Sequence, residues 1–169
     1  MIVMCVAMLR VVLCCKAGQL VTIFLFQLSM GTTMFRNFNV LCRNVRGLNS
    51  PARQRDVRAK IEERHCSILC LQETKCENIN IQMIRSFRTR RFDQFAFSPS
   101  VGASGGILII WNSSVFEGQV LEIQRFSVIV SFKSVHSSEK WTMVLVYGPC
   151  KGQPRDDFVN WLYHLSIPS

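Results

Sequence analysis

Apolar and polar residues alternate from residue 38 onward in a pattern that predicts short strands interleaved with helices. Residues 38–42 alternate as a half-buried strand does, and the run 67–71, apolar after its first residue, has the length of a buried strand. Between them, Ser50 and Pro51 predict the start of a helix, because serine caps helix N-termini and proline is tolerated in the first turn. The first half of this region is therefore expected to form strand, helix and strand in that order.

The second half of the chain is richer in predicted strands. A flexible glycine turn at 102–106 leads into an apolar run, and several alternating segments follow it. Asp156 and Asp157 precede Phe158 and Trp161, which predicts a last amphipathic helix with acidic residues in its first turn. The predicted strands are 92–97, 107–111, 115–123, 126–132 and 141–147. The whole pattern indicates an α/β or α+β domain with an antiparallel-rich sheet and helices on one face.

Residues 1–35 have a different texture. The stretch 17–35 carries no charge and reaches the lower end of a membrane span, but several polar side chains dilute it. A secretory signal needs basic residues before its apolar run, and the first nine residues contain none. Three interpretations stay open: a weak membrane anchor, a secretory signal, or an unselected extension that the domain does not need. We favour the extension, because no helical period or strand alternation persists there, and we place the domain at 36–169.

Charge is concentrated in one third of the chain. The 169 residues carry a net charge of +9, and 49% of them are hydrophobic, as expected of one compact domain. Residues 36–91 hold thirteen basic and five acidic side chains, a net charge of +8. Such a surface suits a polyanion, above all the phosphate backbone of DNA, although a merely solvated basic face fits the same numbers.

Eight cysteines raise the question of disulfides or zinc. No C-x-x-C pair occurs among them, so neither a zinc motif nor a disulfide framework is indicated. Cys66 and Cys70 flank an apolar stretch and are expected to be small core residues. We therefore expect reduced, mostly buried thiols and an intracellular location, in the nucleus or the cytoplasm.

Three polar residues at predicted strand ends could carry chemistry. Glu73 follows a buried strand, where a carboxylate can hold Mg²⁺ together with water and substrate phosphate. Asn44 could orient a phosphate oxygen through its amide, but it fits a turn-forming role before Gly47 equally well. The Tyr147 hydroxyl could donate to a phosphate, and its alternative is a place at the edge of the core.

Four sequence motifs follow one another in an order that also occurs in a known protein family. They are Asn44-Val-Arg-Gly-Leu-Asn49, Leu71-Gln-Glu-Thr-Lys75, Ser104-Gly-Gly-Ile-Leu108 with Trp111, and Val146-Tyr-Gly-Pro149 with Arg155, Phe158 and Trp161-Leu162. In order and spacing they resemble the first half of the endonuclease/exonuclease/phosphatase domain, in the version found in plant LINE-type non-LTR retrotransposons. The resemblance covers about residues 38–169 and none of 1–35.

The resemblance implies a fold, an activity and a set of roles. The family fold is a four-layer α/β/β/α sandwich, and its activity is Mg²⁺-dependent phosphodiester hydrolysis, with Mn²⁺ as a possible substitute and no small-molecule cofactor. In retroelements this domain nicks target DNA. By position, Glu73 corresponds to the metal-binding glutamate, Asn44 to the active-site asparagine, and Tyr147 to the tyrosine near the scissile phosphate. The Ser104-Gly105-Gly106 cluster corresponds to a structural turn.

The sequence also departs from the family pattern. Arg43 stands where the family usually has a tryptophan before its active-site asparagine. Cys150 stands where an asparagine often follows the Tyr-x-Pro motif in the wider family. The later Gly-Asp-Asn strand end and Asp-His pair have no counterpart, and none of His65, His136 and His164 substitutes for them. We therefore expect a sandwich truncated after its first half, with a second sheet lacking most of its strands, marginal stability and no activity alone.

Two other classes of function remain. The first is a non-enzymatic nucleic-acid-binding remnant that uses the basic span 36–91, since phosphate contacts need only lysine and arginine. Its expected contacts are Arg46, Arg88, Arg90 and Arg91. The second is a membrane-anchored protein attached through residues 1–35.

Overall fold

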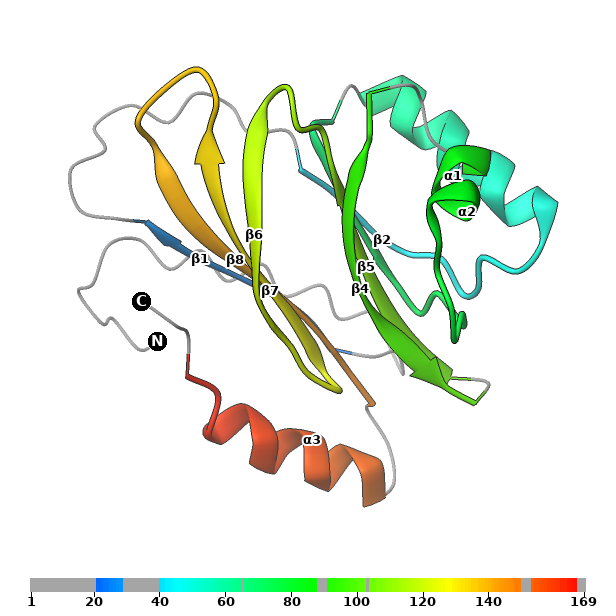
Figure 1. Cartoon of the computed structure of the whole chain (residues 1–169). Coiled ribbons are helices and arrows are strands. Elements are labelled where there is room, and N and C mark those ends of the chain that lie inside the picture. Colours follow the sequence, from blue (N-terminus) through cyan, green and yellow to red (C-terminus); the bar gives the residue numbers. More distant parts are fainter. Residues whose placement is uncertain are drawn as a thin grey trace.

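Two sheets lie face to face, with helices on their outer sides (Figure 1). This computed structural model describes residues 21–28, 40–64, 66–87, 91–102, 104–149 and 153–166; at 21–28, 87 and 153–154 it describes the backbone alone. The elements are β1 (Val21–Leu28), β2 (Val40–Asn44), α1 (Pro51–Arg64), β3 (Ile68–Gln72), α2 (Ile81–Phe87), β4 (Gln94–Val101), β5 (Ser104–Trp111), β6 (Phe116–Ile123), β7 (Ser127–Ser134), β8 (Lys140–Gly148) and α3 (Gln153–Tyr163). The chain is thus a mixed helix and strand protein of the α+β class.

Each sheet has four strands. One has the order β2-β3-β5-β4, in which β2 runs parallel to β3 and the other pairs are antiparallel. The other has the order β1-β8-β7-β6 and is antiparallel throughout. The strands predicted after residue 66 are confirmed to within a few residues, because their alternation or continuous apolar character is a local signal.

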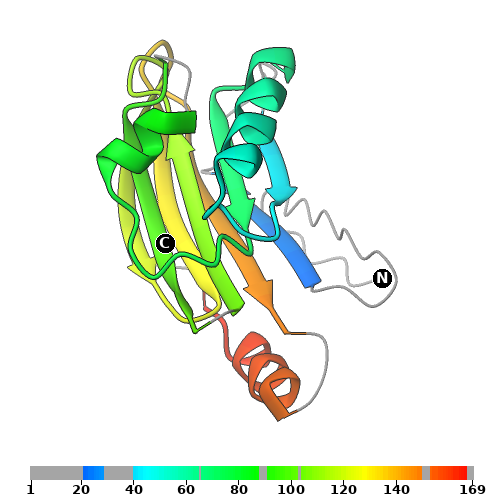
Figure 2. The ribbon, with the colours of Figure 1, turned by 90° about the vertical axis from the view of Figure 1, so that its right-hand side faces the viewer.

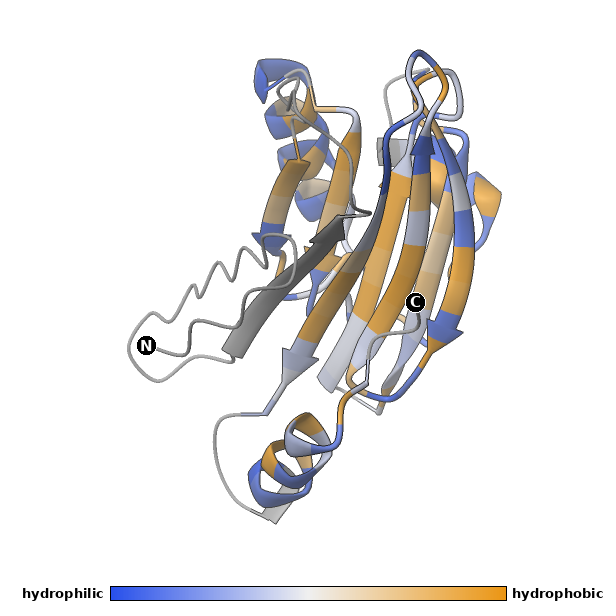
Figure 3. Ribbon diagram, turned by 90° about the vertical axis from the view of Figure 1, so that its left-hand side faces the viewer, coloured by the Kyte–Doolittle hydropathy of each residue, from blue (hydrophilic) through white to orange (hydrophobic). Residues whose placement is uncertain are grey.

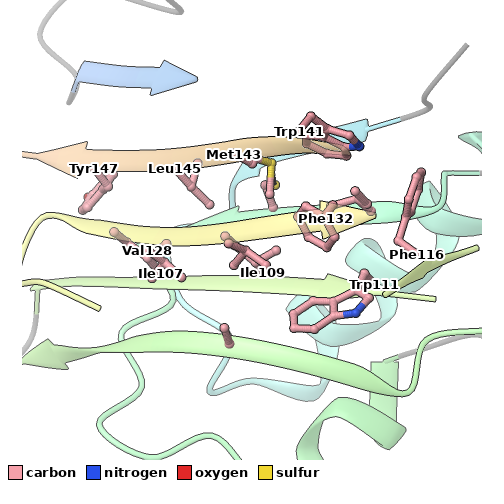
Figure 4. Packing of buried hydrophobic residues seen from close by; sticks show 14 residues of the cluster. Ile107, Ile109, Trp111, Phe116, Val128, Phe132, Trp141, Met143, Leu145 and Tyr147 are labelled. Carbon is pink, nitrogen blue, oxygen red and sulfur yellow. Dashed lines mark hydrogen bonds between the residues drawn. The ribbon is translucent and has the colours of Figure 1, made fainter. Parts of the chain in front are cut away.

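The main core fills the space between the sheets. Ile107, Ile109 and Trp111 leave β5 toward the opposite sheet, whereas Leu108 and Ile110 leave it toward the helices. In the close view, Trp141, Met143, Leu145 and Tyr147 extend from β8 into the same layer (Figure 4). Strand alternation therefore assigns each apolar residue to one of two layers, and β5 is buried on both sides.

Helices cover the outer face of both sheets (Figures 1 and 2). Helices α1 and α2 bury Val57, Ile61 and Ile84 against the outer side of the β2-β3-β5-β4 sheet. Helix α3 packs Phe158 against Val146 of the other sheet and against Phe126, which directly precedes β7. The expectation of helices on one face of a single sheet is wrong, because alternation shows which positions are buried but not what covers them.

Helix α1 begins as its sequence predicts. The Ser50 Oγ accepts a hydrogen bond from the Arg53 backbone N–H at 3.3 Å, and Pro51 is the first helical residue. Coloured by hydropathy, the helix is largely polar, whereas the strands that flank the core are mostly apolar (Figure 3). The helix therefore depends on a narrow buried stripe, Val57 and Ile61, rather than on a broad apolar face.

Strand β1 comes from the leader, where the sequence analysis expects no strand. It pairs with β8 over its whole length, from Val21 opposite Gly148 to Leu28 opposite Trp141. A short apolar run without alternation is compatible with a strand, and β8 would otherwise present a row of unpaired backbone groups on that side. The expected lack of most strands in the second sheet is also wrong, since this sheet has four: β1 and the three strands predicted at 115–123, 126–132 and 141–147. None of the helices in the described part of the chain combines the length and apolarity of a membrane span.

The described cysteines are free thiols. Cys66, Cys70 and Cys76 are buried, which confirms the core role expected for the first two, and Cys42 is exposed on β2. Burial raises the pKa of the Cys70 thiol well above its ordinary value, with a smaller contribution from the neighbouring Cys42. The folded state therefore keeps this proton at a pH where the unfolded chain begins to lose it.

This thiol gives a pH-dependent contribution to stability. Because the pKa of Cys70 is raised by folding, its contribution is complete below the ordinary cysteine pKa and decreases as pH rises above it. Between about pH 7.5 and 9.5, we expect the free energy of unfolding to fall more for the native sequence than for Cys70→Ala, by at most about 1.4 kcal/mol per pH unit. Urea unfolding at both pH values measures this, and parallel losses in the two proteins would contradict it.

Candidate functional site

The carboxyl ends of three strands meet at one end of the molecule. Asn44, the last residue of β2, lies opposite Gln72, the last residue of the parallel strand β3. The Gln72 side-chain Nε2 donates a hydrogen bond of 3.0 Å to the Val146 carbonyl of β8, in the opposite sheet. Glu73 follows Gln72 and Tyr147 follows Val146, so the backbones of Asn44, Glu73 and Tyr147 gather around this one bond.

Gln72 is a residue that the sequence analysis did not single out. Its side chain is only 1% exposed, and it ends a strand that is buried at every position. The signal was a polar residue at the end of an apolar run, directly before the candidate ligand Glu73. A buried amide needs partners, and here it satisfies that need by joining the two sheets.

The loop after β3 places Glu73 in an unusual backbone conformation. Glu73 has a φ of 57° and Lys75 a φ of 55°, both in the left-handed region that side chains other than glycine rarely adopt. The Glu73 carbonyl accepts the Gly47 N–H at 2.7 Å, and the Thr74 carbonyl accepts the Leu48 N–H at 2.8 Å. Backbone strain of this kind persists where surrounding contacts enforce it and is concentrated at functional sites.

The Glu73 carboxylate is partly accessible. Its side chain is 18% exposed, and its Oε1 lies 3.5 Å from the Lys75 Nζ. This lysine competes with any cation for the carboxylate, but the separation is longer than a strong charged hydrogen bond. The carboxylate can therefore bind a hydrated cation if the lysine moves aside.

The two glycines that start β5 support this loop. Their carbonyls accept the N–H groups of Lys75 and Thr74, at 3.1 Å from Gly105 and 3.2 Å from Gly106. Gly106 has a φ of 90°, and a Cβ added there would collide with the Thr74 Oγ1. The glycine pair thus has a structural role next to the candidate site, because it allows the loop backbone to approach β5 closely.

The side-chain oxygen of Asn44 takes part in a turn, and its amide nitrogen does not. Its Oδ1 accepts the Arg46 N–H at 3.1 Å. Because that partner is a donor, the accepting atom must be the oxygen, and the amide nitrogen is left as a donor without a partner among the described residues. The turn-forming alternative is therefore realised, and it leaves an N–H₂ group suited to a phosphate oxygen.

Tyr147 is buried at 5% exposure and belongs to the core between the sheets. Its backbone N–H donates to the Phe126 carbonyl at 2.9 Å. In the close view its ring extends from β8 beyond Leu145, at the end of the row of core residues (Figure 4). The core-edge alternative thus describes where the ring lies, and a phosphate would have to approach this end of the core to reach it.

The other candidate residues are spread more widely. Arg46 and Arg91 are both exposed, Arg46 in the turn after β2 and Arg91 before β4, whereas Arg88 and Arg90 lie outside the described residues. His136 is exposed between β7 and β8, and His164 follows α3, where its Nδ1 lies 2.7 Å from the Asn160 carbonyl oxygen. Neither of these histidines shares an element with the strand ends that carry Asn44 and Glu73.

Known proteins offer no direct identification. No family model and no curated protein matches this chain. Its function must therefore be inferred from the residues at the strand ends. Among the residues that the structure describes, no cluster of three or more histidine, cysteine, aspartate or glutamate side chains could hold a metal. The donor set fits a hydrated Mg²⁺ on one carboxylate, since this ion keeps several waters, and it does not fit a closed metal centre.

The packing of the glycine pair predicts a selective effect of substitution. In Gly106→Ala the new methyl group meets the Thr74 hydroxyl and the backbone takes a left-handed conformation, so we expect a loss of about 1–3 kcal/mol in the free energy of unfolding. Gly102→Ala is the control, because its φ is also positive but its added Cβ meets nothing within 4 Å.

A double substitution separates the collision from the backbone strain. Combining Gly106→Ala with Thr74→Ala removes the colliding hydroxyl, so part of the lost stability should return. Chemical denaturation of these three variants and of the native sequence measures the differences. Equal losses for Gly106→Ala and Gly102→Ala would show that the contact with Thr74 has no energetic weight.

Proposed function

We propose that residues 40–166 carry part of a Mg²⁺-dependent phosphodiesterase site of the endonuclease/exonuclease/phosphatase type, in the version found in LINE-type retrotransposons. In this proposal Glu73 is the metal ligand, Asn44 orients a phosphate oxygen, and Tyr147 lies near the scissile phosphate. Mn²⁺ is expected to replace Mg²⁺ at the same carboxylate. The substrate class is DNA, recognised through its phosphodiester backbone.

The single observation that carries the proposal is the meeting of β2, β3 and β8 at one end. The Gln72 side chain joins two residues 74 positions apart there, since it donates to the Val146 carbonyl. Glu73 and Tyr147 directly follow these two residues, and Asn44 is the strand partner of Gln72. A chance similarity of short motifs would not require the motif-bearing strand ends to meet. The two sheets with helices outside also agree with the family fold.

Glu73 and Asn44 have different roles at the proposed site. Glu73 supplies the negative charge that binds the cation, and the free Asn44 amide nitrogen donates a hydrogen bond to a non-bridging phosphate oxygen. Bound there, the cation would polarise the phosphoryl group. The left-handed backbone at Glu73 holds its Cα in place before any ligand arrives, which lowers the entropic cost of binding.

We further propose that this chain is inactive by itself. Hydrolysis needs a base that activates water, and losing general-base catalysis alone costs on the order of 10²–10⁴ in rate. The residues that supply this base in the family are among those without a counterpart in the sequence, which include its Asp-His pair. We therefore expect this chain to bind the metal ion without hydrolysing DNA.

A second candidate function is nucleic-acid binding without hydrolysis. The net charge of +8 in residues 36–91 favours it, because phosphate contacts require only cationic side chains. This function needs neither Glu73 nor a metal. The two candidates are therefore distinguished by whether binding depends on that carboxylate.

Glu73→Gln tests the metal site directly. We expect the native chain to bind one Mn²⁺ at the strand ends and the variant to bind it at least about 10–100-fold more weakly, because the variant loses the carboxylate assigned as the metal ligand. Electron paramagnetic resonance of free Mn²⁺ measures this during a titration. Glu77→Gln is the matched control, since this exposed glutamate has the same charge and lies in the same loop.

Plasmid nicking completes the test. With Mg²⁺ present, the native chain and Glu73→Gln are expected to relax supercoiled DNA at the same background rate. Faster nicking by the native chain than by the variant would overturn the proposed inactivity while supporting the metal site. Unchanged Mn²⁺ binding in Glu73→Gln would refute the assignment of the site itself.

A further inference from the structure

A groove of about 320 Å³ lies between the edge strand β2 and helix α1. It is separate from the core between the sheets, because the inner strand positions face that core and this groove faces the helix. Asn44 lines it at the end of β2, and Val57 forms part of its apolar floor. The charged residues around it are Arg43, Arg46, Arg53 and Asp56.

The charge in this groove is not neutralised within the protein. None of Arg43, Arg46 and Arg53 forms an ion pair with any residue that the structure describes, and Asp56 is the one acidic residue of the lining. By contrast, Arg58 on the same helix pairs with Glu62 at 3.0 Å. Three arginines and one aspartate in the lining give the groove an excess of positive charge, which favours binding of an anion.

The backbone also fixes one of these arginines. Arg46 has a φ of 51°, and its N–H donates to the Asn44 Oδ1, so the turn that bears Arg46 is held by a residue that lines the same groove. Helix α1 has no acidic residue in its first turn, where Arg53 lies. The positive end of the helix therefore adds to the arginine charge instead of being neutralised by a side chain.

We propose that this groove binds a backbone phosphate of a nucleic-acid strand. The arginines would contact the phosphate oxygens, for which their planar guanidinium groups are well suited. Asp56, which an anion would avoid, can accept a hydrogen bond from a base amino group. This inference rests on the proposed function. It places a nucleic-acid strand that is bound at Asn44 and Glu73 so that it continues along the outer side of β2.

A nucleic-acid strand fits the groove better than an isolated anion. Asn44 borders both the groove and the strand-end site, so a chain of phosphates can occupy the two together. The groove lies beside the last strand of its sheet, and Arg46 and Arg53 are both exposed. Such contacts position a backbone without selecting a sequence.

The test compares two double variants of the full chain. Arg46→Gln with Arg53→Gln removes two exposed groove charges, and Arg58→Gln with Arg85→Gln removes two exposed charges of α1 and α2 that lie outside the groove lining. Binding of a fluorescein-labelled DNA duplex is followed by anisotropy in EDTA at several salt concentrations. For the groove variant we expect weaker binding and a salt slope lower by roughly two, about 0.9 for each lost phosphate contact.

The outcomes separate this inference from the proposed function. Equal weakening in both double variants would show a general charge effect and overturn the groove. Binding that survives Glu73→Gln but not the groove variant would support the groove whether or not the metal site exists. Circular dichroism confirms that each variant is folded. Arg46→Lys with Arg53→Lys should keep part of the affinity for DNA. Competition by pyrophosphate as strong as that by DNA, per phosphate, would show a free-phosphate site and contradict a strand.

Discussion

The bond between the Gln72 side chain and the Val146 carbonyl is the contact on which the candidate site depends. It crosses between the two sheets at the end where β2, β3 and β8 finish, and it joins residues 74 positions apart. Leaving either buried partner unsatisfied would cost about 1–3 kcal/mol, so the sheets are held in one relative position at this end. Asn44, Glu73 and Tyr147 take their places from that alignment.

The loop that follows β3 fixes the backbone of the candidate ligand Glu73. Two non-glycine residues in left-handed conformations, Glu73 and Lys75, are held by hydrogen bonds to the turn after β2 and to the glycine pair of β5. The strain is thus balanced by contacts from two neighbouring elements. One consequence is that the Glu73 backbone has a fixed conformation before any ligand binds.

Local patterns predicted much of this structure. The strands after residue 66 and the start of α1 followed from alternation and capping, which depend only on neighbouring residues. Strand β1 could not be predicted in this way, because it is stabilised by pairing with β8, more than a hundred residues away. The role of Gln72 was missed for the same reason, since its partner lies in another sheet. A strand-end signal made Asn44 and Glu73 candidates, and the alternative given for Tyr147, a place at the edge of the core, describes where its ring lies.

One measurement addresses the shared site most directly. Backbone amide signals of the full chain, recorded by nuclear magnetic resonance during addition of Mn²⁺, should broaden first at Asn44, Glu73 and Tyr147 together, and this broadening should vanish in Glu73→Gln. Broadening confined to other acidic positions, such as Glu62 or Asp156, or unchanged in the variant, would contradict a common cation site at these three strand ends.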